Sequence, residues 1–259
     1  MKIVAFDSEN NNKQVAWICF YDGKNFYDFK SQKKAIAFLD SFKTETYFFA
    51  TNLSYDLLNI WSRDDFIREV SCFYGKSRLI TATYGKCKFM DTLNSWPMSV
   101  SLMGHVVGLP KLDMEYDNER LFSEAGRNYC RRDTEITYLF TVSMLEKYDK
   151  LGIPFKSTIA STALNYFIKA FDGGGIKYRK IKTKTLDRLR PYYMGGRCEA
   201  FFIGNINRGS ADAPGIHCID YNSLYPSVMK DNKFPNPYYY YKGKSIKKEP
   251  KNAFYLATV

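Results

Sequence analysis

A carboxylate interrupts the apolar stripe of the longest helix that the sequence predicts. Residues 127–150 have helical periodicity, and one face of that helix holds, at the spacing of successive turns, Tyr129, Asp133, Ile136 and Phe140. Asp133 is therefore expected to face the core. An unpaired buried charge is prohibitively costly, so this carboxylate must be paired, protonated or bound to a metal ion.

The immediate neighbours of Asp133 are poorly placed to neutralise it. Arg131 and Arg132 lie one and two positions away, and side chains at those spacings on a helix point in other directions. A distant arginine is the leading alternative to a metal ion, and the sequence leaves both open.

Three further acids lie where a fold would point them inward. Residues 2–6 are an apolar run, and on a strand Asp7 and Glu9 share a face with Ile3 and Ala5. Asp56 follows a second strand candidate and opens a predicted helix. The alternatives are a frayed strand with solvated charges, and a helix-start aspartate that compensates the macrodipole.

Together the four acids indicate a chemistry. Ligands that offer only oxygen atoms select hard cations such as Mg²⁺ or Mn²⁺, and two such ions about 3.5–4 Å apart stabilise attacking water and leaving oxygen. Tyr129 is expected to orient the water, while deprotonation depends on the metal because a free phenol has a pKa near 10.

The acids also lie within recognisable motifs. Segments 7–9, 52–56 and 129–133 resemble, in order, the three exonuclease motifs of family B DNA polymerases, in the DEDD form that carries a tyrosine. The resemblance implies a ribonuclease H-like 3′-to-5′ exonuclease. Its catalytic residues would be Asp7, Glu9, Asp56, Tyr129 and Asp133, with the four acids as ligands for two Mg²⁺ or Mn²⁺ ions.

Two later segments resemble the protein-primed branch of that family, whose members replicate small linear phage genomes from a terminal protein. Residues 193–197 resemble its YxGG element, which implies contacts to template DNA from Tyr193, Gly195, Gly196 and Arg197. Residues 220–227 resemble polymerase motif A, DxxSLYPS, which makes Asp220 a ligand of the polymerase metal site.

Finer features carry over by the same resemblance. Lys111 and Tyr116 match the catalytic-lysine segment, while Thr92 and Leu93 match a motif that binds single-stranded DNA. The unpaired 3′ end would be held by Asn52 and Tyr55, and Phe49 could stack on a base. The non-functional alternatives are a solvated loop cation at Lys111, core packing at Trp96 and a tight turn at the paired glycines.

The sequence departs from the family at several places. Asn10 and Thr51 stand where relatives carry threonine and histidine, and the second palm carboxylate motif and the fingers helix are absent. We therefore expect polymerisation only with the missing palm, fingers and thumb. Three origins remain open: an N-terminal part of a longer polymerase, one subunit of a split polymerase, or a free-standing exonuclease.

Charge and composition agree with a DNA-binding protein. From residue 176 to the end there are 16 Lys and Arg against 6 Asp and Glu, so nearly all of the net charge of +11 lies in the last third. A basic segment threaded with tyrosines suits phosphate neutralisation and base stacking, although a solvated lysine-rich surface is the simpler alternative. The six cysteines form no C-x-x-C pair, so the sequence indicates neither a zinc ribbon nor a disulfide framework.

The expected architecture is α/β with a mixed sheet. Domain boundaries are expected at 1–150 (exonuclease), 151–190 (connecting helix and linker) and 191–259 (start of the palm). Strands are predicted at 2–6, 15–21, 47–50, 79–84, 86–91 and 216–221, with a hairpin turn at Gly85; helices are predicted at 33–43, 56–64, 127–150 and 158–171.

The function expected from these observations is proofreading 3′-to-5′ hydrolysis of DNA ends. Expected partners are a single-stranded 3′ end, primer-template DNA, a terminal protein and a second polymerase polypeptide. No apolar run reaches the about 18 residues of a membrane span, so a soluble cytoplasmic protein is expected, in the host-cell cytoplasm if a phage encodes it. The alternatives are a non-catalytic DNA-binding or assembly subunit and a nuclease that acts on RNA.

Overall fold

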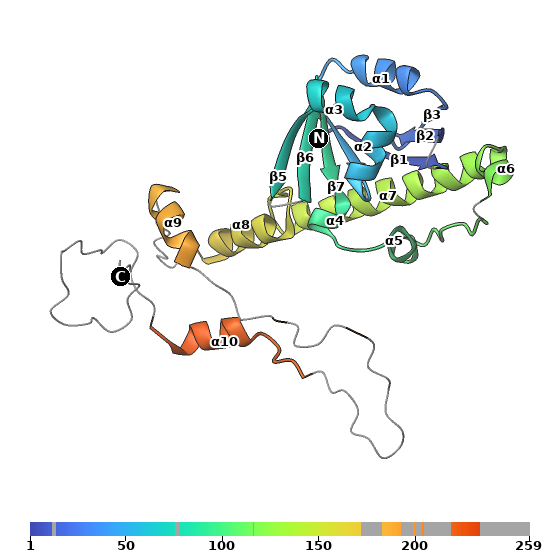
Figure 1. Ribbon diagram of the computed structural model, residues 1–259. Helices are drawn as coiled ribbons and strands as arrows, with labels where there is room; N and C mark the ends of the chain where they lie inside the picture. The colour runs from blue at the N-terminus through green and yellow to red at the C-terminus, as the bar shows by residue number, and fades with distance from the viewer. Residues whose placement is uncertain are drawn as a thin grey trace. The chain divides into compact units, whose positions relative to one another are not determined.

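The chain divides into two compact units, Met1–Ile176 and Lys177–Val259. A computed structural model describes residues 1–11, 14–75, 78–115, 117–171, 183–192, 199, 204 and 219–233. The first unit contains a sheet covered by helices (Figure 1). In the second unit the described elements are α9 (Thr183–Leu189), a 3₁₀ turn (Arg190–Tyr192) and α10 (Leu224–Asp231).

Seven strands form one mixed sheet in the order β3-β2-β1-β4-β7-β6-β5. The three central strands β1, β4 and β7 are parallel, while the outer strands on both sides pair antiparallel. The bounds are β1 Ile3–Asn10, β2 Val15–Tyr21, β3 Phe26–Phe29, β4 Thr46–Ala50, β5 Ser71–Gly75, β6 Arg78–Tyr84 and β7 Cys87–Asp91. The expected mixed α/β architecture is confirmed.

Helices cover both faces of this sheet (Figure 1). One face carries α1 (Gln32–Asp40) and α2 (Leu53–Ile60), and the other carries α7 (Glu124–Lys150) with α5 (Val100–Val107) packed against it. The remaining described helices of this unit are α3 Arg63–Glu69, α4 Thr92–Ser95, α6 Asn118–Leu121 and α8 Ile159–Phe171.

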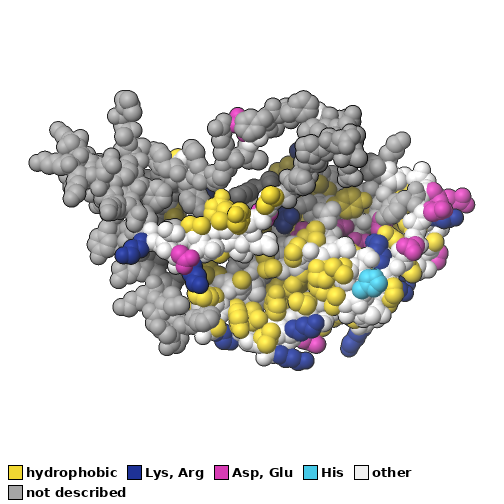
Figure 2. Space-filling model, turned by 90° about the horizontal axis from the view of Figure 1, so that it is seen from below, with side chains coloured by type: hydrophobic (Ala, Val, Ile, Leu, Met, Phe, Trp, Pro, Cys, Tyr) yellow, Lys and Arg dark blue, Asp and Glu magenta, His cyan; other side chains and the backbone are white. Residues whose placement is uncertain are grey.

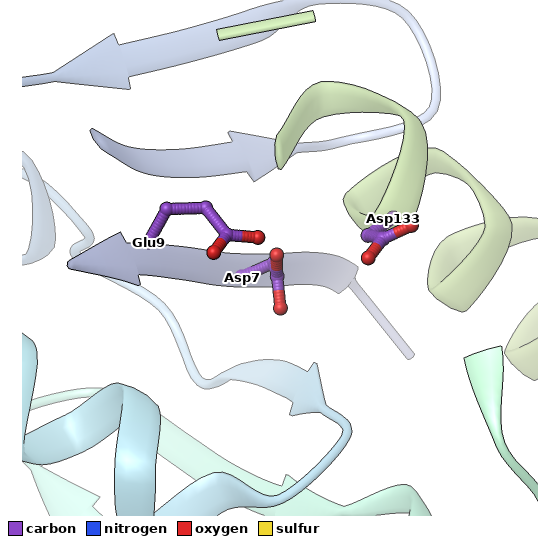
Figure 3. Close-up of side chains that lie close together, drawn as sticks. All are labelled: Asp7, Glu9 and Asp133. Carbon is purple, nitrogen blue, oxygen red and sulfur yellow. The ribbon is translucent and has the colours of Figure 1, made fainter. Parts of the chain in front are cut away.

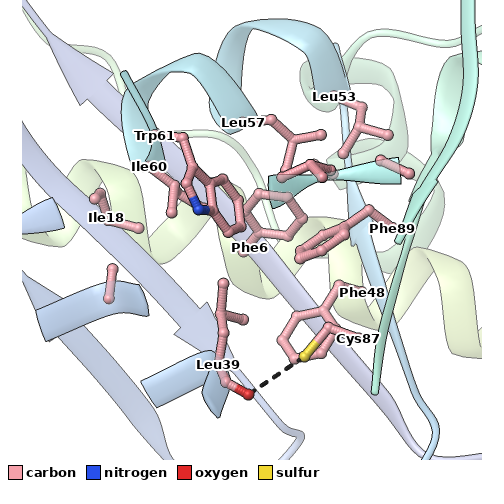
Figure 4. Packing of buried hydrophobic residues seen from close by; sticks show 14 of the residues in the cluster. Phe6, Ile18, Leu39, Phe48, Leu53, Leu57, Ile60, Trp61, Cys87 and Phe89 are labelled. Atoms are coloured by element: carbon pink, nitrogen blue, oxygen red, sulfur yellow. Dashed lines mark hydrogen bonds between the residues drawn. The ribbon is translucent and has the colours of Figure 1, made fainter. Parts of the chain in front are cut away.

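The strand period of two sorts the core into these two layers. Phe6, Phe48 and Phe89 from the three central strands meet Leu57 and Trp61 beneath α1 and α2, with ring centroids 5.3–6.4 Å apart among the three phenylalanines (Figure 4). On the opposite face, a second cluster joins the strands to α7 and α5 through Phe49, Met90, Trp96, Met103, Ile136 and Phe140.

The strand β1 is longer than the apolar run that predicted it. It pairs with β4 only from Ile3 to Ala5, yet it continues beside β2 to Asn10, with Asp7 opposite Cys19 and Glu9 opposite Trp17. Asp7 and Glu9 therefore lie on strand backbone beyond the point where the pairing with β4 ends.

Some expected elements differ from the structure. The edge strands β3 and β5 were not predicted, and the helix expected at 56–64 is two helices, because Trp61 is extended and the Ser62 hydroxyl accepts from Asp65 N–H as a new N-cap. Of the strand expected at 216–221, residues 219–221 are described and are not in a strand. A strand is stabilised by a ladder partner, and the described residues provide none there.

The close approach of α5 to the following loop depends on a glycine. A Cβ on Gly104 would lie 2.6 Å from the Leu109 carbonyl oxygen, and Leu109 N–H donates to Gly104 O. Met103 is fully buried against α7, whereas Leu102 and Val106 are each about half exposed, and Figure 2 shows hydrophobic side chains on this surface. The contact between Gly104 and Leu109 holds the loop that leads to Lys111.

Among the described residues, no helix is both long enough and apolar enough to cross a membrane.

Candidate metal centre and DNA-end site

Three acidic side chains converge between β1 and α7. Asp7 and Glu9 project from β1 toward Asp133, which α7 presents across the face of the strand (Figure 3). One carboxylate oxygen from each lies within 4.8 Å of the others. The predicted buried stripe on α7 is confirmed, since Asp133 is 4% exposed and Tyr129, Ile136 and Phe140 are also buried.

Asp56 reaches the same region from the first turn of α2. It is almost fully buried, and its Oδ1 accepts a 2.6 Å hydrogen bond from the Ser8 hydroxyl. Asp56 does not belong to the group within 4.8 Å. Among neighbouring charges, however, that of Asp56 raises the pKa of Asp7 most, followed by those of Glu9 and Asp133. The other three acids therefore all interact electrostatically with Asp7.

The pKa values of Asp7, Asp56 and Asp133 are displaced upward. Loss of hydration raises the pKa of Asp7 well above its ordinary value, and the charges of Asp56 and Glu9 raise it further. Burial likewise raises the pKa of Asp56, and the hydrogen bond from Ser8 only partly opposes this effect. Without a compensating cation, Asp7 and Asp56 keep their protons to a higher pH than ordinary aspartates do.

The donor set fits a hard divalent cation. All candidate ligand atoms are carboxylate oxygens, and two buried oxygens, Asp56 Oδ2 and Asp133 Oδ1, have no hydrogen-bond partner among the described residues. A buried carboxylate oxygen without a partner is costly, and coordination to Mg²⁺ or Mn²⁺ would satisfy it. The acids predicted from the sequence are therefore chemically suited to bind the expected cofactor, Mg²⁺ or Mn²⁺.

This pKa pattern predicts an unusual pH dependence of stability in metal-free buffer. At pH values between the ordinary aspartate pKa, 3.8, and the raised values of Asp7 and Asp56, the native state keeps protons that the unfolded chain has lost. The free energy of unfolding should therefore fall as pH rises through this window, by about 1.4 kcal/mol for each unit of pKa separation. Urea unfolding in EDTA from pH 4.5 to 8 measures this effect.

Two controls test whether the acid cluster causes this loss of stability at high pH. Asp7→Asn should flatten the curve, and Mn²⁺ should remove the loss of stability at high pH. Asp22 does not interfere, because hydrogen bonds from Asn25 and Lys24 outweigh its burial and lower its pKa, which moves its effect below pH 3.8. A stability that climbs steadily with pH in EDTA would contradict the crowding of like charges.

The partner of Asp133 in the structure is a lysine and not an arginine. Lys111 Nζ forms an ion pair with Asp133 Oδ2, with side chains 28% and 5% exposed. Arg131 instead binds Asp28 together with Arg127, and Arg132 donates to the Pro110 carbonyl. Burial alone would lower the pKa of Lys111, but the hydrogen bond with Asp133 outweighs it and raises that pKa, so the ammonium stays charged.

Tyr129 lies beside this pair. Its ring centroid is 4.6 Å from Lys111 Nζ, and burial raises the pKa of its phenol, although the Lys111 contact works in the opposite direction. The phenol is therefore neutral at physiological pH. It can donate or accept a hydrogen bond, which suits orienting a water better than removing its proton.

The residues predicted to hold a DNA end have mixed surroundings. Asn52 is exposed at the N-terminus of α2 with a left-handed φ of 72°, and Tyr55 is 41% exposed beside it. Leu93 is half-buried, while Thr92 is buried with its hydroxyl 2.9 Å from that of Thr51.

Phe49 differs from expectation. Its ring is 1% exposed and lies in the core against Phe155, with centroids 5.9 Å apart, so its faces are not open to a base. The β-strand period turns Phe49 toward α7, and the sequence pattern around it does not reveal how completely that side is covered. Trp96 is likewise core, as the simpler alternative had it.

The remaining predicted site residues lie in the second unit or outside the described residues. Asp220 is exposed in the second unit, outside any strand. Outside the described residues lie Tyr116, Tyr193, Gly195, Gly196 and Arg197.

Asp91 was given no role from the sequence, yet it organises the loops around the site. Its Oδ1 accepts from Leu93 N–H at 2.9 Å and from Asn52 N–H at 3.2 Å, and its Oδ2 accepts from Leu53 N–H at 3.2 Å. One buried carboxylate thus caps α4 and α2 together. An aspartate at a strand end before Thr-Leu is a helix-cap signal that could have identified the first of these contacts, but not the second.

Comparison with known proteins agrees with this arrangement. The family described as DNA polymerase type B, organellar and viral, matches residues 110–258, more than half of the chain. The DNA-directed DNA polymerase of Enterobacteria phage PRD1 is 24% identical over 263 residues, which is 96% of this chain and 43% of that protein.

Solved structures share the fold. Phi29 DNA polymerase complexed with primer-template DNA and incoming nucleotides aligns with a TM-score of 0.54 at 16% identity, over 76% of this chain and 39% of that one. Its complex with single-stranded DNA gives the same TM-score and identity over 40% of that chain. This chain thus spans less than half of the length of the relatives it matches. The resemblance to the protein-primed branch is confirmed, and the chain belongs to the type B DNA polymerases of the organellar and viral family.

Proposed function

We propose that this chain carries the 3′-to-5′ exonuclease site of a protein-primed-type family B DNA polymerase and removes nucleotides from DNA 3′ ends. The observation that carries the proposal is the convergence of carboxylate oxygens from Asp7, Glu9 and Asp133 within 4.8 Å. Like charges at this spacing repel one another, and a bound divalent cation would offset that repulsion.

The side chains divide the work of hydrolysis. Asp7, Glu9 and Asp133, with Asp56, would hold divalent cations that lower the pKa of water and neutralise charge on the scissile phosphate. Tyr129 orients the attacking water by a hydrogen bond, and the Lys111 ammonium stabilises negative charge that develops on the phosphate. The water oxygen forms a bond to phosphorus while the P–O bond to the 3′ oxygen of the preceding nucleotide breaks. That oxygen takes a proton, and the terminal nucleotide leaves as a deoxynucleoside monophosphate.

The exposed end of α2 would receive the DNA. Asn52 and Tyr55 lie at its N-terminus, within four positions of Asp56, so a terminal nucleotide bound to them would place its phosphate near the acids. Phi29 DNA polymerase has been solved with single-stranded DNA, which supports the same class of ligand here. For polymerisation, we propose that Asp220 and the YxGG element act only with the rest of a complete polymerase.

A direct assay tests this function. A 5′-labelled single-stranded DNA oligonucleotide, incubated with the chain and Mg²⁺, is expected to shorten stepwise from its 3′ end with release of monophosphates, and EDTA should stop the reaction. The same oligonucleotide in RNA form should decay more slowly. DNA binding without any trimming in Mg²⁺ or Mn²⁺ would favour a non-catalytic assembly subunit, and faster decay of RNA would favour an RNA-directed nuclease.

The terminal protein, the second polypeptide and the location in the host cytoplasm stay predictions. The basic and tyrosine-rich character of residues 176–259 supports a further DNA contact.

A further inference from the structure

The residue between the first two acids faces the opposite side of β1. Ser8 alternates with Asp7 and Glu9, so its side chain points toward α2 and is only 2% exposed. There its hydroxyl donates to Asp56 Oδ1 at 2.6 Å. The strand β1 thus presents Asp7 and Glu9 on one face, and Ser8 on its other face holds Asp56 through a hydrogen bond.

The direction of this hydrogen bond is determined by a second one. Asn59 Nδ2, one turn after Asp56 on α2, donates to Ser8 Oγ at 2.8 Å. Because an amide nitrogen can only donate, Ser8 Oγ must accept from it, which leaves the hydroxyl hydrogen for Asp56.

The orientation of Asn59 is determined in turn. Asn10 Nδ2 donates to Asn59 Oδ1, so the amide oxygen is occupied and the amide nitrogen faces Ser8. Gln32 Nε2 also donates to the Asn59 backbone carbonyl at 3.0 Å, which ties this part of α2 to α1. The result is a one-way series of donors from Asn10 through Asn59 and Ser8 to Asp56, and aligned donors of this kind strengthen one another.

The series decides which oxygen of Asp56 remains available. Oδ1 is occupied by Ser8, while Oδ2 is buried and has no hydrogen-bond partner among the described residues. Because Ser8 lies between Asp7 and Glu9 on β1, the hydrogen bond from its hydroxyl holds the Asp56 carboxylate beside the strand that carries both acids.

We propose that Ser8 and Asn59 are positioning residues that hold Asp56 with Oδ2 free to complete a divalent-cation site beside Asp7. The inference rests on the proposed function, in which Asp56 is a ligand. The residues concerned lie outside the four acids, and partners of this kind orient metal ligands and typically change metal affinity or activity about 10- to 100-fold when removed.

The test is calorimetric titration of the full chain with Mn²⁺, with no substrate present. Ser8→Ala and Asn59→Ala are expected to weaken the binding step that depends on Asp56 by about 10- to 100-fold, and to leave the tighter step of the Asp7, Glu9 and Asp133 group in place. In the trimming assay, the Mg²⁺ concentration for half-maximal rate should rise by a similar factor, while the rate at saturating Mg²⁺ recovers toward that of the wild type.

Thr141→Val is the matched control. Thr141 is a fully buried residue of α7 whose hydroxyl has no hydrogen-bond partner among the described residues, so its replacement removes a buried hydroxyl that contacts no acid. Its Mn²⁺ titration should match the wild type. If Ser8→Ala is poorly folded by circular dichroism, Asn59→Ala carries the test, because it keeps the Ser8 hydroxyl and removes the amide donor that orients it.

The outcomes separate the inference from the function. Mn²⁺ affinities of both variants equal to those of Thr141→Val, with Asp56→Ala impaired, would overturn the role of Ser8 and Asn59 and leave the exonuclease proposal intact. A wild-type chain that binds no Mn²⁺ and trims no DNA would overturn both.

Discussion

Replacing Asp7 by asparagine together with Glu9 by glutamine is expected to reduce Mg²⁺-dependent trimming of single-stranded DNA by at least about a thousandfold. Divalent cations supply several kcal/mol of transition-state stabilisation, and each 1.4 kcal/mol is about a factor of ten in rate. The double variant removes two of the three carboxylates that lie within 4.8 Å of one another, while it preserves side-chain shape. The measurement is the initial rate of monophosphate release at saturating DNA.

The same variant should not unfold, and this separates loss of chemistry from loss of structure. In the wild type, burial and the charges of Asp56 and Glu9 raise the pKa of Asp7, so the native state carries unfavourable repulsion at neutral pH. Neutral amides remove it. In EDTA at pH 8 the double variant should therefore have a higher urea midpoint than the wild type, whereas in Mn²⁺ the order should reverse, because only the wild type gains from cation binding.

A matched control makes the same two kinds of substitution, Asp→Asn and Glu→Gln, at acids outside the cluster. Asp64→Asn with Glu146→Gln exchanges two exposed acids on α3 and α7, and it should leave both the trimming rate and the metal dependence of stability unchanged. Equal trimming rates in the wild type and the Asp7 and Glu9 variant would show that these acids do not serve catalysis.

Local periodicity explains why much of this site was predictable. The spacing of Asp133 between Tyr129 and Ile136 on one helix, and the alternation that places Asp7 beside Glu9 on one strand face, are consequences of backbone geometry within a single element. The hairpin at Gly85 was predictable for the same reason, since its φ of 54° suits glycine. Patterns within one element need no knowledge of the tertiary fold.

The contacts between elements were not predictable in this way. The partner of Asp133 proved to be Lys111, 22 positions earlier, and the hydroxyl that holds Asp56 comes from Ser8, 48 positions earlier. No pattern in a single sequence specifies such pairs. The two short edge strands were missed because β3 and β5 have neither a long apolar run nor clear alternation, and their place is set by pairing with β2 and β6.

Substitutions of the two partners of the Lys111–Asp133 ion pair are expected to change Mn²⁺ affinity in different ways. Asp133→Ala removes a ligand and leaves a partly buried ammonium over the Tyr129 ring, so Mn²⁺ binding should be lost and the trimming rate should fall about a hundred- to a thousandfold. Lys111→Met removes only the competing cation. Its Mn²⁺ affinity should be equal to or higher than that of the wild type, because Asp133 Oδ2 is then free for the metal ion.

The trimming rate of Lys111→Met should nevertheless fall, by about a hundredfold, because a positive charge near the reacting phosphate is lost. Asp28→Asn supplies the control: Asp28 is a buried acid paired with Arg127 and Arg131, so its loss should lower stability and leave Mn²⁺ binding as it is. A parallel loss of Mn²⁺ affinity in Lys111→Met and Asp133→Ala would mean that the pair only supports the fold. If only Asp133→Ala loses Mn²⁺ affinity while both variants lose trimming rate, Asp133 binds the metal ion and Lys111 acts on the reacting phosphate.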